Sequence, residues 1–244
     1  MSARVTGAVA VRVLRQLRRD PRTIVLLLAV PPILMALLHA LFKGRPEVFQ
    51  DVGVPLLGLF PFITMFLVTS ITMLRERTSG TLERLMTMPL AKLDLLLGYG
   101  IAFAVVAAGQ AAIVSVVAFG LLDLHTAGPR WIVVVLAVGN AVLGMALGLS
   151  VSAFAETEFQ AVQFMPAVVL PQLLLCGLFV ARSEMADWLR WISDALPLTY
   201  AYDALARAAR DLFDARFAVD VCVIVGATLL ALVLGAATLR RRTE

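Results

Sequence analysis

The sequence predicts an all-α polytopic membrane protein with six transmembrane helices. Of its 244 residues, 61% are hydrophobic and 16% are charged, whereas a soluble domain carries charges at roughly a quarter of its positions. Six uninterrupted apolar runs each reach the length of about 20 residues that a helix needs to cross a bilayer. None of the 21 basic and 17 acidic residues lies inside a run. Continuous runs favour helices over a β-barrel, whose strands alternate apolar and polar side chains.

The apolar runs define the domain organisation. They take up over half of the chain, so we expect residues 1–244 to form one transmembrane domain, with no room for a soluble catalytic domain. Arginines precede the first run, as in a signal peptide, but its core is too long, so we expect a retained anchor. Cys176 and Cys222 are expected to fill apolar space, and no metal site is expected. The predicted spans are residues 23–42, 54–74, 95–122, 131–155, 159–181 and 221–239.

The charges between the runs predict the orientation. Six spans place both termini on one side of the membrane. That side carries thirteen basic and seven acidic residues, whereas the opposite side carries eight basic and ten acidic residues. Cytoplasmic loops of membrane proteins are enriched in arginine and lysine, so we expect both termini in the cytoplasm.

An arginine-rich interface helix is predicted over residues 4–20. At 100° per residue its arginines share one side, while Val9, Val13 and Leu17 share the other. We expect it to lie in the headgroup plane with its apolar face in the lipid, and its arginines toward anionic lipid or an acidic partner. The alternative is that the arginines only fix the topology. They are Arg4, Arg12, Arg15, Arg18 and Arg19.

A second non-spanning segment, residues 75–94, separates the second and third runs. Gly80 permits a turn, and residues 81–88 can form a short helix that Pro89 ends. Leu82, Leu85 and Met86 lie on one face of this helix. Because two turns are not stable alone in water, that face needs a groove on a partner; an ordinary loop is the alternative.

Two further segments lie outside the runs. Residues 185–214 predict two short external helices on or in the outer leaflet, separated at Pro197 and supported by i,i+4 pairs such as Asp203–Arg207. A plain extracellular loop is the alternative. Glu156 and Glu158, in the turn between the fourth and fifth runs, are expected to be solvated, with contact to a basic patch of a partner as the alternative.

Two of these segments carry a family resemblance. Residues 76–89 fit the pattern E-x-x-x-G-T-L-E-x-L-x-x-x-P, and residues 197–205 are similar to P-L-T-Y-x-x-D-A-L. Both patterns resemble those of type-2 ABC exporter permeases, in the layout of daunorubicin-resistance-type drug exporters. The matching residues are Glu76, Gly80, Thr81, Leu82, Glu83, Leu85 and Pro89 in the first pattern, and Pro197, Leu198, Thr199, Tyr200 and Asp203 in the second.

The resemblance implies a division of labour between subunits. Residues 81–88, with Arg84 and Met86, would form a coupling helix in a cleft of a separate ABC ATPase subunit, and the helix carrying Arg12–Arg19 would make a second contact there. Members of the family work as dimers of permeases with two ATPase subunits. The second permease chain would be identical or homologous to this one.

The lack of charged residues in the runs and of a nucleotide-binding motif indicates that the energy for transport comes from outside this chain. Carriers driven by ions keep ionisable residues within the membrane, and the predicted runs hold none apart from His39 near the outer end of the first run. No G-x-x-x-x-G-K-[ST] phosphate loop is present, so ATP and magnesium are expected on the partner subunit. Four amides inside runs either line a substrate path or join packed helices. These amides are Gln110, Asn140, Gln163 and Gln172.

The expected function is export of an amphipathic drug, antibiotic or lipid-like molecule across the bacterial plasma membrane. Export of a polysaccharide or glycolipid is the alternative within the family. The chain itself is not expected to be an enzyme, because it has no H-E-x-x-H motif and no buried Ser–His pair is apparent. A channel is disfavoured because no charged pore ring is present. No nucleic-acid partner is expected.

Overall fold

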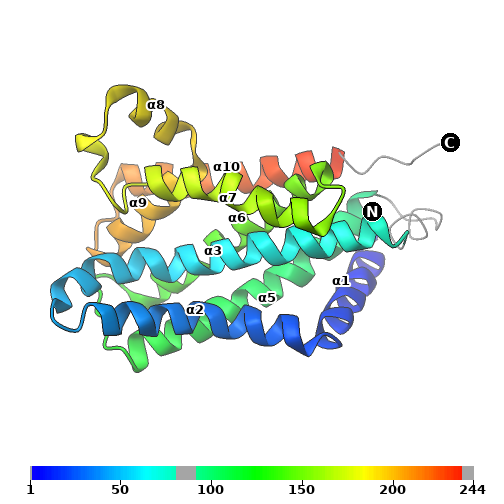
Figure 1. Cartoon of the computed structure of the whole chain (residues 1–244), viewed down its shortest axis with the longest axis horizontal. Helices are drawn as coiled ribbons and strands as arrows, with labels where there is room; N and C mark the ends of the chain where they lie inside the picture. Colours follow the sequence, from blue (N-terminus) through cyan, green and yellow to red (C-terminus); the bar gives the residue numbers. More distant parts are fainter. Residues whose placement is uncertain (1, 81–91, 238–244) are drawn as a thin grey trace.

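The computed structural model describes residues 2–80 and 92–237, and within these ranges it is helical. The long helices lie along the long axis of the molecule, and α1 crosses one end of this bundle while α8 and α9 lie toward the other (Figure 1). We call these the α1 end and the α9 end. The helices are α1 (Ala3–Arg18), α2 (Pro21–Leu41), α3 (Pro46–Thr78), α5 (Lys92–Gly120), α6 (Arg130–Val151), α7 (Glu158–Leu175), α8 (Asp187–Ala195), α9 (Pro197–Ala209) and α10 (Ala215–Ala237), with 3-10 turns η1 (Ser152–Phe154) and η2 (Arg182–Glu184).

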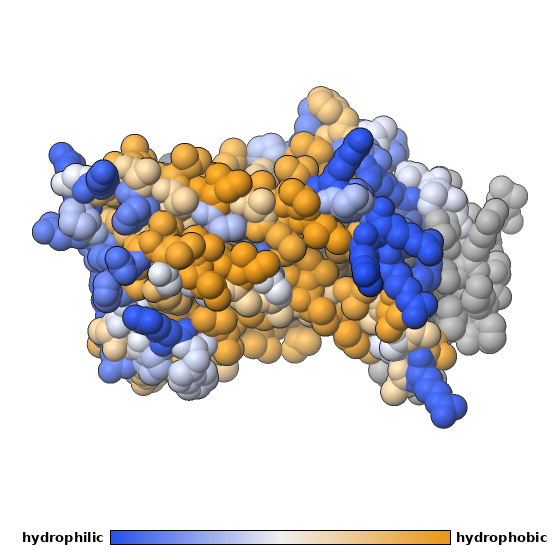
Figure 2. Space-filling view, turned by 90° about the horizontal axis from the view of Figure 1, so that it is seen from below, coloured by the Kyte–Doolittle hydropathy of each residue, from blue (hydrophilic) through white to orange (hydrophobic). Residues whose placement is uncertain are grey.

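Six of these helices are long and apolar enough to span a membrane, as the apolar runs predict: α2, α3, α5, α6, α7 and α10. An apolar band surrounds the middle of the molecule on the face seen in Figure 2, and hydrophilic residues gather at its two ends. The α1 helix and the last described turn of α10 lie at the same end of the bundle, in agreement with an even number of spans.

The helix bounds differ most from the predicted spans at three places. Helix α3 begins at Pro46, eight residues before the predicted span, because proline suits the first turn of a helix. Helix α7 ends at Leu175, six residues early, and Gly177 then takes a φ of 103°, in a region that L side chains rarely adopt. Helix α10 begins at Ala215 and therefore includes Asp220. The helix therefore begins six residues before the predicted charge-free run 221–239, and Asp220 lies one residue before that run.

Helix α3 is the centre of the bundle, and it packs most closely against α6. The backbone of α6 approaches α3 at Gly144 and Gly148, where an added Cβ would lie 2.2 Å from the carbonyl oxygen of Phe62 and 2.4 Å from that of Phe66. A side chain at either glycine would therefore push the helices apart. Gly139 of the same helix differs from these two glycines, because a Cβ added there would meet no neighbouring atom within 4 Å.

Helix α1 does not present its apolar face to lipid. Val9, Ala10, Val13 and Leu17 are buried in one hydrophobic cluster with residues of α5, among them Tyr99. The expectation that this apolar face lies in the headgroup region is therefore wrong, because protein covers it. A helix of this length is marginal by itself, and packing against α5 stabilises it. The helix runs over Ala3–Arg18, against the predicted residues 4–20.

Candidate functional site

A junction at the α1 end joins α1 to the last turns of α3. Glu76, two residues before the end of α3, is 3% exposed. The side-chain amide of Gln16 donates a hydrogen bond of 2.7 Å to Glu76 Oε1, and a guanidinium nitrogen of Arg12 lies 3.4 Å from Oε2. Burial of a carboxylate is costly unless it is paired and hydrogen-bonded, so these contacts hold α1 in place. We call Glu76, Arg12 and Gln16 the α1–α3 junction.

Residues 76–89, which carry the first family pattern and which we call the signature segment, begin at Glu76 of the junction. Helix α3 ends at Thr78, and Gly80 follows with a φ of 68°, as expected for a turn at glycine. The other signature residues, Thr81, Leu82, Glu83, Arg84, Leu85, Met86 and Pro89, lie outside the described residues, and so does the proposed coupling helix.

The remaining arginines of α1 differ from Arg12 in their surroundings. Arg4, Arg15, Arg18 and Arg19 are exposed, whereas Arg12 is half-buried against α3. One arginine is thus committed to a contact within the chain, and four are exposed to the surroundings.

A second polar contact ties α7 to α3 at the same end. The guanidinium of Arg75 makes two hydrogen bonds, of 2.8 and 3.0 Å, to the carboxylate of Glu158 at the start of α7. The expectation that Glu158 is merely solvated is therefore wrong, although both side chains remain more than half exposed. Exposed pairs contribute little stability, so this contact orients the start of α7 more than it stabilises it.

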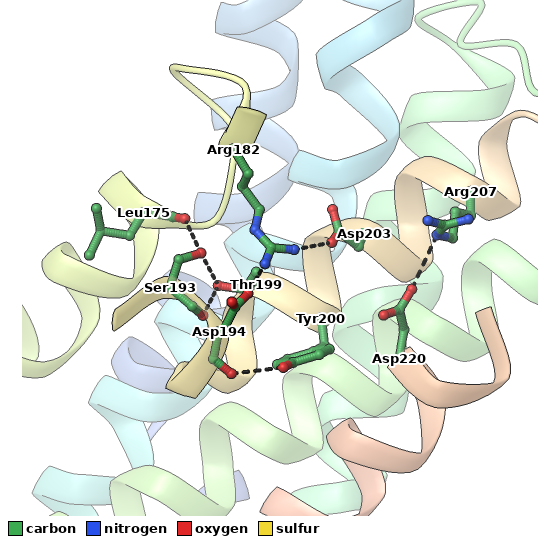
Figure 3. Close-up of polar contacts among 9 residues, drawn as sticks. All are labelled: Leu175, Arg182, Ser193, Asp194, Thr199, Tyr200, Asp203, Arg207 and Asp220. Carbon is green, nitrogen blue, oxygen red and sulfur yellow. Dashed lines mark hydrogen bonds and ion pairs between the residues drawn. The ribbon is translucent and has the colours of Figure 1, made fainter. Parts of the chain in front are cut away.

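A larger polar network lies at the α9 end, and it contains three of the five residues of the external pattern, Thr199, Tyr200 and Asp203 (Figure 3). Pro197 opens α9, and Leu198 and Thr199 are fully buried. The Thr199 hydroxyl donates to the carbonyl of Ser193 at 2.8 Å, and the Tyr200 hydroxyl donates to the carbonyl of Asp194 at 2.7 Å. These bonds fold the end of α8 back onto the start of α9.

Arginines connect this fold-back to neighbouring elements. Arg182, in η2, pairs with Asp194 of α8 and, at 2.9 Å, with Asp203 of α9. The Ser193 hydroxyl donates at 2.8 Å to the carbonyl of Leu175, the last residue of α7. Together these contacts fix the chain that leaves α7. We use the name α9 network for the residues joined by these contacts and by those of Arg207. They are Arg182, Ser193, Asp194, Thr199, Tyr200, Asp203, Arg207 and Asp220.

Arg207 of α9 joins the network to α10. It lies 2.9 Å from Asp214 and 3.3 Å from Asp220, which is 6% exposed. The i,i+4 pair expected between Asp203 and Arg207 is therefore replaced by tertiary pairs. Burial raises the pKa of Asp203, and the neighbouring Arg182 and Arg207 only partly oppose this rise.

Sequence reasoning missed Arg182, Ser193 and Asp220. None of them falls in the recognised pattern, and their partners lie between 6 and 21 residues away, in other elements. Periodicity within one helix cannot find such pairs, because it compares only neighbours on the same element.

The four intramembrane amides lie in different surroundings. Gln110 of α5 is buried and donates to the carbonyl of Leu27 and to the Thr64 hydroxyl, which joins three helices. Asn140 of α6 is buried, with no hydrogen-bond partner among the described residues. Gln172 donates within its own helix α7, and Gln163 is exposed beside a pocket of about 450 Å³. The packing alternative fits Gln110, and a substrate contact by the others stays a prediction.

Within residues 2–80 and 92–237, no group of three His, Cys, Asp or Glu side chains could hold a metal ion. The two cysteines are free; Cys176 is buried and Cys222 is exposed.

Comparison with known proteins places the chain in a family. ABC transporter G family member 20 of Dictyostelium discoideum is 25% identical over 147 residues, which are 60% of this chain and 20% of that protein. The probable multidrug ABC transporter permease YbhR of Escherichia coli K12 is 26% identical over 148 residues, 61% of this chain and 40% of that protein. The match therefore spans less than half the length of these relatives. Residues 4–208 match the ABC-2 type transporter family, and the chain belongs to that family.

Proposed function

We propose that this chain is the permease subunit of an ATP-driven exporter, with ATP and magnesium bound by a separate ATPase subunit and a second permease chain completing the membrane part. Its place would be the bacterial plasma membrane, with both termini and the α1 end in the cytoplasm. The substrate would be an amphipathic molecule such as a drug, antibiotic or lipid-like compound. The observation that carries this proposal is the buried α1–α3 junction, which adjoins the signature segment.

The junction offers a mechanical route from a soluble subunit into the membrane. Motion of residues 81–89 would act on the end of α3, two residues beyond Glu76, and the bonds from Arg12 and Gln16 would carry α1 with it. The exposed Arg15, Arg18 and Arg19 would give α1 its own contact with the ATPase.

Helix α3 can transmit this motion over the length of the bundle. It is 33 residues long and runs from the junction to the α9 end, where it packs on α9. At about 1.5 Å per residue, such a helix extends roughly 50 Å. Its close backbone contact with α6 at Gly144 and Gly148 means that α6 would move with α3. A displacement at the cytoplasmic end would thus reach the outer elements.

Replacing Glu83 with Lys tests this function in the complex that copurifies with the full chain. We expect Glu83→Lys to abolish transport-coupled ATP hydrolysis while the chain still inserts, because the signature helix would then carry the wrong charge for its cleft. The measurement is ATPase activity in lipid nanodiscs with and without transported substrate.

The matched control is Glu184→Lys, which makes the same change of charge at an exposed residue near the α9 end. This control should keep the stimulation seen in the unaltered chain. Full substrate-stimulated ATPase activity in Glu83→Lys would contradict the coupling role.

A further inference from the structure

A pocket of about 360 Å³ lies beside the α9 network, between the chain that follows α7 and helix α9. Three arginines line it, Arg182, Arg207 and Arg210, against one carboxylate, that of Asp203. The formal charge of the wall is therefore two units positive. The rest of the wall is small or apolar, apart from Tyr202. A pocket of this composition suits an anionic group attached to an apolar body.

The carboxylates that pair with Arg182 and Arg207 offset the charge of those two arginines, so the uncompensated positive charge of the wall is that of Arg210. Asp194, Asp214 and Asp220 pair with Arg182 or Arg207, yet none of the three lines the pocket. They hold the guanidinium groups from behind. A guanidinium has five N–H donors in a fixed plane, so a group held in this way still has donors to offer.

Two arginines retain unused binding capacity. The buried Nε of Arg182 has no hydrogen-bond partner among the described residues. Arg210 is exposed at the end of α9 and makes no ion pair in the part of the chain that the structure describes. It lies close enough to Tyr202 to oppose the rise that burial imposes on the pKa of that hydroxyl. Arg210 is thus the arginine of the pocket that lacks a counter-charge.

We propose that this pocket binds the anionic headgroup of an amphiphile, a phosphate or a carboxylate, with Arg210 as its principal ligand. Guanidinium groups bind both anions through paired, charge-assisted hydrogen bonds. Arg182 and Arg207, held in place by their carboxylates, contribute N–H donors that do not have to be ordered on binding. Ala181, Ala206 and Leu212 offer apolar contact. The amphiphile is either a resident anionic lipid or the exported molecule, and in the second case the inference rests on the proposed function.

Binding of defined probes to the purified full chain, without ATP, tests this site. The probes are dihexanoyl phosphatidylglycerol, which is anionic, dihexanoyl phosphatidylcholine, which is zwitterionic, and inorganic phosphate. We expect saturable binding of the anionic lipid, weaker at high salt because exposed charges are screened. Arg210→Gln should weaken this binding about tenfold, the effect of removing one charge-assisted contact.

The matched control is Arg216→Gln, which removes the same charge from an exposed residue outside the pocket. Its binding should stay within about twofold of the unaltered chain, since only an exposed charge that salt screens, outside the lining of the pocket, is lost. Three results would each overturn the proposal. They are an equal loss of binding in the two variants, equal binding of the anionic and the zwitterionic lipid, and a protein that binds inorganic phosphate but not the anionic lipid.

Export by the assembled complex then separates the two sources of the headgroup. If Arg210→Gln lowers export in proportion to binding, the exported molecule supplies the headgroup; if export is unchanged while copurified anionic lipid is lost, a resident lipid supplies it. The failure of the permease assignment is distinct from both, because it would show in Glu83→Lys retaining substrate-stimulated ATPase activity. Anion binding without ATP does not depend on that result.

Discussion

Replacing Glu76 with Ala is expected to uncouple ATP hydrolysis from export, with the amount exported per ATP falling at least about tenfold. The substitution removes the acceptor for both Gln16 and Arg12, so α1 would no longer follow the end of α3. Leaving such donors without their charged partner costs about 1–3 kcal/mol. A tenfold effect corresponds to about 1.4 kcal/mol, which lies within that range.

The ratio of export to hydrolysis separates coupling from stability. A merely structural defect would lower both activities together by reducing the amount of folded protein, whereas loss of coupling lowers the ratio. Glu76→Gln should be intermediate, because it keeps an oxygen acceptor for Gln16 but loses the charge that faces Arg12. Glu47→Ala, an exposed glutamate at the opposite end of α3, is the control. An unchanged ratio in Glu76→Ala would show that the junction only stabilises the fold.

Replacing Arg182 with Ala is expected to loosen α8 from the bundle. Arg182 pairs with Asp194 of α8 and Asp203 of α9, and α8 otherwise packs mainly on α7 and α9. Breaking a fully buried pair costs about 3–5 kcal/mol, and exposed pairs less than about 1 kcal/mol. Because Arg182 and Asp203 are each about a quarter exposed, we expect about 2 kcal/mol. Amide exchange in α8 should accelerate about 30-fold.

The effect of Arg182→Ala should depend on pH. Burial already raises the pKa of Asp203 above its ordinary value of 3.8, and Arg182 opposes this rise. Without Arg182 the folded-state pKa rises further, so the unfolded state binds fewer protons than the folded state. Stability then falls as pH increases through the window between 3.8 and the raised pKa. The defect should be larger at pH 7 than at pH 5.

Two companion variants make this prediction specific. The double variant Arg182→Ala with Asp203→Asn removes the buried charge as well as its partner. Amide exchange in α8 should therefore be slower in the double variant than in Arg182→Ala alone, and it should not depend on pH through Asp203. Arg190→Ala removes a partly exposed arginine of α8 that pairs with Asp187 of the same helix. This variant should change amide exchange in α8 less than about threefold. Equal exchange in Arg182→Ala and Arg190→Ala would contradict the anchoring role.

The spans and their number follow from composition because burial in lipid demands long apolar helices. Helix ends were less predictable, since a hydropathy pattern stops at the first charge although the helix continues. Helix α3 shows this at its start, where Glu47 and Asp51 lie within the helix but outside the apolar run. The end of α7 depended on the backbone of Gly177, which a count of apolar residues does not register.

The polar contacts were predicted less well than the helices. The arginines of α1 were recognised, but the amphipathic pattern does not say whether lipid or protein covers the apolar face, and α5 covers it here. The external pattern identified Thr199, Tyr200 and Asp203, whereas their partners Ser193 and Arg182 come from segments brought together only by the fold. Glu76 was found from the family signature, and its bonds to Arg12 and Gln16 were not.

Reconstitution of the purified chain in liposomes, with and without the ATPase subunit that copurifies with it, most directly tests the dependence on an external ATPase. The account predicts ATP-dependent movement of an amphipathic fluorescent substrate only when both proteins and magnesium ATP are present. Movement of the substrate against its gradient by this chain alone would contradict the account.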